Sequence, residues 1–99
     1  MVYTINEPAA FGAYTAIEAA GRAGEVLIVS VDGGCSGVEG VNDGRIGATS
    51  QQYPLAMASL GVEAGVNYAQ TGEKVSGYTD TGVTLITNSA VDGLSLIHI

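Results

Sequence analysis

The sequence is poor in basic residues and cysteine, and it has no long apolar run. Ten acidic side chains stand against three basic ones, which gives a formal net charge of −7. A surface of that sign repels phosphate backbones, so we expect no nucleic-acid partner. The single cysteine, Cys35, cannot form an intramolecular disulfide and therefore does not indicate a redox compartment. No apolar run approaches the ~20 residues that a membrane-spanning helix needs.

The secretory signal-peptide pattern, a basic segment followed by an apolar one, is not visible in the sequence. Met1 is followed at once by a strand-like run, and we expect the chain to be a fragment of a longer protein. Its 99 residues are 46% hydrophobic and 13% charged. That composition is typical of a chain that folds, and the length allows one small domain at most.

Residues 26–31 (Val-Leu-Ile-Val-Ser-Val) form an aliphatic run without alternation. Such a run predicts a strand that is buried on both faces of a parallel sheet. It ends in Asp32 and two glycines. Ligands of open α/β sheets lie beyond the carboxyl ends of the strands, so Asp32 stands where a ligand would be met.

Two further strand-like runs also end in polar side chains. Residues 2–5 are followed by Asn6, and residues 46–50 are followed by Gln51 and Gln52. Because parallel strands present their carboxyl ends at one edge of a sheet, these side chains and Asp32 predict a binding site there.

A helix is expected over residues 7–20, with Asn6 as its N-cap and Pro8 in its first turn. Its three-residue spacing of large apolar side chains predicts core positions at Phe11, Tyr14 and Ile17. Together with the flanking strands this helix makes a βαβ unit, whose two strands should be parallel.

The rest of the chain predicts shorter or less clearly packed elements. Residues 38–41 allow only a turn or two of helix, and residues 82–87 read as a last strand. A second helix over residues 54–70 is apolar around most of its circumference, which predicts neighbours on more than one side.

Several motifs follow one another in a recognisable order. They are Thr-Ile-Asn-Glu (4–7), Val-Ser-Val-Asp-Gly (29–33), Val-Asn-Asp-Gly-Arg-Ile-Gly-Ala-Thr (41–49), Gln-Gln-Tyr-Pro (51–54) and Thr-Gly-Glu-Lys (71–74). In this order they resemble the C-terminal third of the type I periplasmic sugar-binding proteins of ABC importers, in the ribose- and fructose-binding group.

The resemblance implies an α/β fold: a partial doubly wound parallel sheet, the C-terminal portion of a two-lobed periplasmic-binding-protein type I fold. Residues 1–52 would belong to the C-terminal lobe. Residues 53–77 would form a helix of the other lobe plus a hinge, and residues 78–93 a return hinge and the last strand. Residues 94–99 depart from the family pattern, and we expect them to be a non-native tail.

The resemblance also implies a function. The full-length parent would bind a monosaccharide such as fructose or ribose between its lobes and pass it to an ABC permease, its only link to the membrane. The parent would be periplasmic, would catalyse no reaction and would need no cofactor. At matching positions, Asn6, Asp32 and Gln52 would grip the sugar hydroxyls.

Each of these residues has a simpler interpretation. Asn6 could be only an N-cap, and Asp32 could end its strand in an Asx-turn with Gly34. A one-residue slip would exchange Gln52 for Gln51. The family match favours ligand contact for Asp32 and both roles together for Asn6.

Alternative functions remain open. The effector domain of a LacI-type, sugar-responsive repressor shares this fold and much of the motif order. A receiver-like phosphoacceptor could use Asp32, but the acidic pair and lysine that it needs have no match. Cys35 with His98 is a poor nucleophilic pair, and we expect a buried or half-buried thiol. No spacing matches a P-loop, a calcium loop or a zinc site, so no metal is expected.

Overall fold

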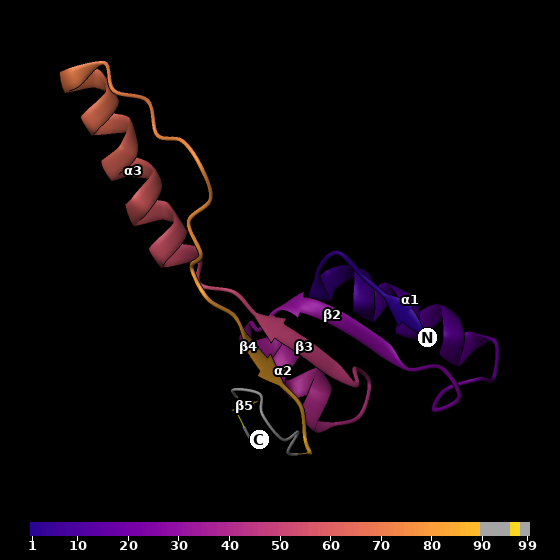
Figure 1. Cartoon of the computed structure of the whole chain (residues 1–99). Helices are drawn as coiled ribbons and strands as arrows, with labels where there is room; N and C mark the ends of the chain where they lie inside the picture. Colours follow the sequence, from indigo (N-terminus) through magenta and orange to yellow (C-terminus); the bar gives the residue numbers. More distant parts are fainter. Residues whose placement is uncertain (90–95, 98–99) are drawn as a thin grey trace. The chain divides into compact units, whose positions relative to one another are not determined.

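The computed structural model describes residues 1–89 and 96–97 of the chain. It divides into two compact units, which are described separately (Figure 1). The first comprises Met1–Gln52 together with the segment from Val83 onward, and the second comprises Tyr53–Gly82.

The first unit contains a sheet with strand order β1-β2-β3-β4-β5. The pairs β1–β2, β2–β3 and β4–β5 are parallel, whereas β4 runs antiparallel to β3. The strand bounds are Val2–Tyr3 for β1, Ile28–Asp32 for β2, Ala48–Gln51 for β3, Thr84–Ile86 for β4 and Leu96–Ile97 for β5.

This sheet confirms the α/β class and the parallel βαβ unit, with one difference. The antiparallel β4 makes the sheet mostly, and not wholly, parallel. An apolar run does not encode strand direction, because the connection that leads into a strand decides how it enters the sheet. Of the tail expected over residues 94–99, only 96–97 lie within the described residues.

Two helices of the first unit pack on one face of the sheet. The helix α1 (Glu7–Ala19) begins where it was predicted, and Asn6 caps it by accepting a hydrogen bond from the Ala9 N–H at 3.0 Å. The helix α2 (Cys35–Asn42) has about the length of the turn or two predicted over residues 38–41, but it extends beyond those residues at both ends. It starts at Cys35, directly after Gly34, so residues 35–37, which precede the expected helix, are helical as well.

The buried core lies between these helices and the sheet. Ala10 of α1, Ile28 of β2, Val41 of α2 and Ile46 form one buried cluster. The predicted core role of the α1 side chains is confirmed, since the partly buried residues packed against this cluster include Phe11, Tyr14 and Ile17. Both helices therefore bury their apolar sides against the same face of the sheet.

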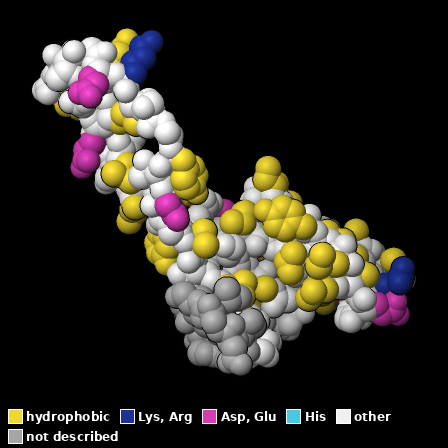
Figure 2. Space-filling view, viewed as in Figure 1, with side chains coloured by type: hydrophobic (Ala, Val, Ile, Leu, Met, Phe, Trp, Pro, Cys, Tyr) yellow, Lys and Arg dark blue, Asp and Glu magenta, His cyan; other side chains and the backbone are white. Residues whose placement is uncertain are grey.

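On the opposite face of the sheet, most of the described side chains are apolar. The register places Tyr3 beside Val29, and Val31 beside Ser50, which in turn pairs with Leu85. Tyr3 is exposed and the others are half-buried. Figure 2 shows hydrophobic side chains gathered on the visible surface of this unit.

The second unit consists of α3 (Pro54–Thr71) and the segment that follows it. Gly72 ends the helix in the left-handed conformation, with φ 72°. None of the α3 side chains is buried, although six of its exposed residues are large and hydrophobic: Leu55, Met57, Leu60, Val62, Val66 and Tyr68. Within the described residues, no helix is both long and apolar enough to cross a membrane.

Shortening one core side chain tests this packing. Ile46 is 1% exposed, and we expect Ile46→Val to lower the free energy of unfolding by about 0.5–1.5 kcal/mol, because it removes a buried methylene group. Urea denaturation followed by circular dichroism measures the change. The matched control is Ile5→Val at a residue that is 79% exposed, which should shift the midpoint little; equal losses in both variants would contradict the assigned core.

Candidate functional site

Asp32 is the last residue of β2 and has an unusual backbone conformation. Its φ of 143° is the one positive value among the described non-glycine residues. Residues with a Cβ rarely adopt such values, and holding one there costs about 1–3 kcal/mol. The carbonyl of Asp32 accepts a hydrogen bond from the Gln52 N–H at 3.1 Å, which ties the strained residue to the segment after β3.

The Asp32 carboxylate accepts hydrogen bonds from two other parts of the chain. Gln52 Nε2 donates to Oδ1 at 2.7 Å, and the Glu7 backbone N–H donates to Oδ2 at 3.3 Å. Glu7 directly follows Asn6, so the chain places the cap of α1 beside this carboxylate. The structure thus joins Asp32 to Gln52 and puts Asn6 one residue from their network.

The Glu7 side chain is the buried centre of this region. Glu7 is only 3% exposed, so its carboxylate is buried. Oε1 accepts from the Gly33 N–H at 2.8 Å and from Thr49 Oγ1 at 2.7 Å, and Oε2 accepts from the Gly34 N–H at 3.2 Å. One side chain on α1 therefore binds both the turn after Asp32 and the strand β3.

Two glycines are needed for this close packing. A Cβ on Gly37 would lie 1.8 Å from Cδ of Glu7, so only a residue without a side chain lets α2 approach the carboxylate. A Cβ on Gly33 would lie 2.4 Å from Cβ of Gln51, and Gly33 has a φ of 69°. Gln51 consequently packs against the turn, while Gln52 reaches Asp32.

The arrangement is chemically suited to hydroxyl groups. A carboxylate offers about four acceptor positions, and the two hydrogen bonds to Asp32 leave about two of them. Asp32 is half-buried, so part of the residue remains exposed to solvent. The cap occupies the carbonyl oxygen of Asn6 and not its NH₂ group. Acceptors and donors side by side are what a polyol needs, since each hydroxyl both donates and accepts.

The structure decides two of the simpler interpretations. The Gly34 N–H donates to Glu7, in place of the Asx-turn bond to Asp32 that was considered. Cys35, expected to be buried or half-buried, is exposed. It is the first residue of α2, whose buried positions are Gly37, Gly40 and Val41, so the thiol falls on the solvent side.

Sequence reasoning missed Glu7 as a member of this region. An acidic residue in the first turn of a helix is ordinary, because it interacts favourably with the helix dipole while remaining in water. Its position beside the N-cap carried no sign of burial. Only the two small residues that it contacts, Gly33 and Gly34, hint at a close approach. Within residues 1–89 and 96–97, no group of three or more His, Cys, Asp or Glu could hold a metal ion.

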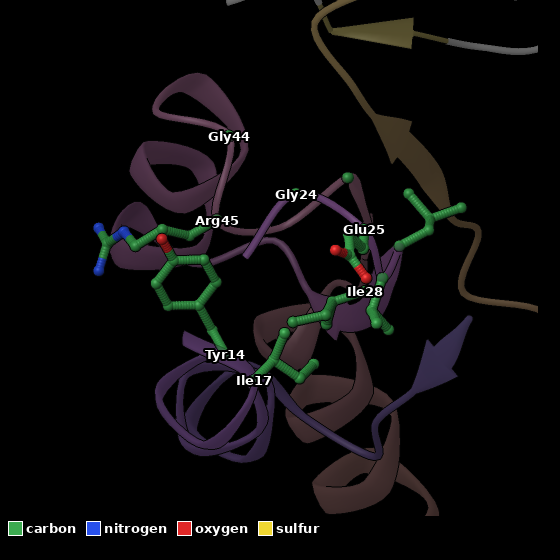
Figure 3. A pocket seen from close by; sticks show the side chains of 10 residues that line it. Tyr14, Ile17, Gly24, Glu25, Ile28, Gly44 and Arg45 are labelled. Carbon is green, nitrogen blue, oxygen red and sulfur yellow. The ribbon is translucent and has the colours of Figure 1, made fainter. Parts of the chain in front are cut away.

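A cavity of about 260 Å³ lies at the other end of β2 (Figure 3). Tyr14, Glu25 and Arg45 are among its lining residues. Its charged groups already have partners: Arg45 pairs with Asp43 at 2.7 Å and Glu25 with Arg22 at 2.8 Å. The hydrogen bond from Arg45 lowers the pKa of the Asp43 carboxyl. This cavity therefore has fewer charged groups available to a ligand than the sheet edge at Asp32.

Comparison with known proteins points to one class. No family model matches the chain. The curated relatives are named as ribose import or D-ribose/D-allose-binding proteins, and the solved structures are solute-binding proteins of ABC transporters, so the resemblance expected from the motifs is confirmed. The relatives carry import or sugar-binding names, which favours transport over the repressor alternative.

Among the relatives is the ribose import binding protein RbsB of Escherichia coli, 38% identical over 74 residues, 75% of this chain and 24% of that protein. The D-ribose/D-allose-binding protein of Pseudomonas aeruginosa is 35% identical over 85 residues, 83% of this chain and 27% of that protein. The chain thus spans about a quarter of the length of the curated relatives that it matches.

Two solved structures share the fold. A solute-binding protein of an ABC transporter from Agrobacterium vitis, with bound D-fucose, has a TM-score of 0.68 and 35% identity, covering 92% of this chain and 31% of that one. A solute-binding protein from Burkholderia multivorans with an unknown ligand has a TM-score of 0.72 and 30% identity. The match covers 86% of this chain and 30% of that one.

A methyl group on α2 tests the buried carboxylate. We expect Gly37→Ala to lower the free energy of unfolding by about 1–3 kcal/mol, because the new Cβ must displace the Glu7 side chain. Gly12→Ala on α1 is the matched control: no heavy atom lies within 4 Å of its new Cβ. That variant should gain about 0.5–1 kcal/mol from helix propensity. Urea denaturation measures the free energy of unfolding of both variants. A Gly37→Ala variant as stable as Gly12→Ala would contradict the packing of α2 against Glu7.

Proposed function

We propose that the first unit of this chain is the sugar-contacting part of one lobe of a two-lobed periplasmic protein, which binds a monosaccharide and delivers it to an ABC permease. The observation that carries the proposal is the Asp32 carboxylate, held by Gln52 and by the N-terminus of α1 with acceptor positions left over. The names of the relatives support a sugar as the ligand class.

Each of the three residues has a distinct role in the proposal. Asp32 accepts hydrogen bonds from sugar hydroxyls, and such charge-assisted bonds are stronger than neutral ones. Gln52 orients Asp32 through Nε2 and keeps its carbonyl oxygen for a hydroxyl donor. Asn6 caps α1 through its oxygen and turns its NH₂ group to the ligand. The site binds and does not catalyse, so no cofactor takes part.

The packing of the chain supports a larger protein around it. Within the described residues, no apolar side chain on the sheet face opposite α1 and α2 is fully buried, and α3 buries none of its side chains. In the proposal, residues 53–77 belong to the second lobe and its hinge, and residues 78–93 return to the first lobe. The separation of Tyr53–Gly82 from the rest of the chain is consistent with that division.

The first test removes the proposed acceptor. In the two-lobed protein that contains this segment, we expect Asp32→Ala to weaken binding of D-ribose or D-fructose by about 10-fold to 100-fold or more, because bonds to a charged group are lost. Isothermal titration calorimetry measures the affinity. Asp43→Ala, at an exposed carboxylate paired with Arg45, is the control and should bind as the unaltered protein does. Undiminished binding by Asp32→Ala would refute the site.

The second test uses the 99-residue chain by itself. We expect it to bind D-ribose or D-fructose weakly or not at all, because a sugar held from one side keeps its other hydroxyls in water. A ¹H–¹⁵N NMR titration with millimolar sugar detects weak contact, and any shifts should concentrate near Asn6, Asp32 and Gln52. Micromolar affinity of the isolated chain would contradict the two-lobed proposal.

A further inference from the structure

We infer that Glu7 is the positioning residue of the Asp32 site: its buried carboxylate fixes the turn and the strand that set the geometry of Asp32 and Gln52. The role of this geometry in sugar binding rests on the proposed function. The geometric inference itself concerns contacts within the first unit only.

The contact between Glu7 and the end of β2 runs in both directions. The backbone N–H of Glu7 donates to the Asp32 carboxylate, while the Glu7 carboxylate accepts from the N–H groups of the next two residues, Gly33 and Gly34. Asp32 is therefore held at its side chain and through the backbone that follows it. This double attachment accounts for a strained φ of 143° that the residue would not keep by itself.

A third hydrogen bond extends the effect to β3. Thr49 is fully buried, and its Oγ1 donates to Glu7 Oε1 at 2.7 Å. Thr49 stands two residues before Gln51, the end of β3, and Gln52 follows. Because the strand is pinned at Thr49, Gln52 leaves the sheet beside Asp32 and donates to it. One carboxylate thus links the segments that carry Asn6, Asp32 and Gln52.

The chemistry requires a carboxylate and not an amide. Both oxygens of Glu7 accept, and all three partners are donors. A glutamine in its place would turn an NH₂ group toward an N–H or O–H donor, because only one of its terminal atoms can accept. Neither of the described ion pairs involves Glu7, so the negative charge is balanced by these donors and by the N-terminus of α1.

The first experiment measures the geometry without a ligand. In ¹⁵N-labelled 99-residue chain, Glu7→Gln should speed the exchange of the Gly33 and Gly34 amide protons by about 10-fold or more. It should also remove the distinct NMR signals of the Gln52 side-chain NH₂ group, which report its bond to Asp32. The matched control is Glu18→Gln, on the exposed side of the same helix, and it should change neither signal.

A second control separates positioning from loss of stability. Ile17→Ala removes a side chain that packs against the core far from Asp32 in sequence, and it should lower the free energy of unfolding while leaving the Gln52 NH₂ signals in place. If Glu7→Gln unfolds the chain, Thr49→Val removes one donor with little change of shape and should alter the Gln52 signals in the same direction. Unchanged Gln52 signals in a folded Glu7→Gln or Thr49→Val variant, or equal changes in Ile17→Ala, would overturn the inference.

The last experiment asks whether the positioning reaches the ligand. The two-lobed protein is titrated with D-ribose and with its 2-deoxy and 3-deoxy analogues. Glu7→Gln should weaken binding of D-ribose by about 10-fold, yet change least the binding of the analogue that lacks the hydroxyl met by Asp32. An equal loss for all three sugars would leave Glu7 a structural residue and contradict positioning. If the unaltered protein binds none of them, the proposed function fails, while the exchange experiment still decides the role of Glu7.

Discussion

The first unit depends on one buried negative charge. Glu7 is 3% exposed, and a carboxylate is expensive to remove from water unless donors replace its hydration. Three donors from two other segments do so, and they can meet Glu7 only if the turn after β2 and the strand β3 hold fixed positions. Gly37 leaves room for the carboxylate because it has no side chain. The requirement to satisfy one charge thus constrains three elements together.

The apolar packing places that network at the edge of the sheet. Ala10, Ile28, Val41 and Ile46 bring α1 and α2 onto one face, so both helices begin near the carboxyl end of β2. Because Asn6 caps α1 and Glu7 is its first residue, the cap and the buried carboxylate lie at the level of Asp32. Within the described residues, the apolar side chains on the other face of this sheet are not fully buried, which is consistent with a larger assembly.

Much of the fold could be predicted from local patterns. The aliphatic run before Asp32 predicts its strand, and Asn6 with Pro8 predicts the start of α1 one turn before Phe11. The antiparallel entry of β4 and the start of α2 before residue 38 were not predicted. Strand direction depends on a distant connection, and the helix expected over residues 38–41 begins three residues earlier, at Cys35. The exposure of Cys35 follows from this earlier start, which makes it the first residue of α2.

The sequence by itself determined which polar residues follow each strand, because strands and caps are specified by neighbours a few positions apart. The strand ends therefore indicated Asn6, Asp32, Gln51 and Gln52, and the family resemblance selected Asn6, Asp32 and Gln52 as candidates. Only the tertiary structure decided that Gln52 and not Gln51 bonds to the Asp32 carboxylate, and that Glu7 is buried among donors. Those outcomes depend on strand register and helix approach, which arise from contacts between residues 20 to 42 positions apart.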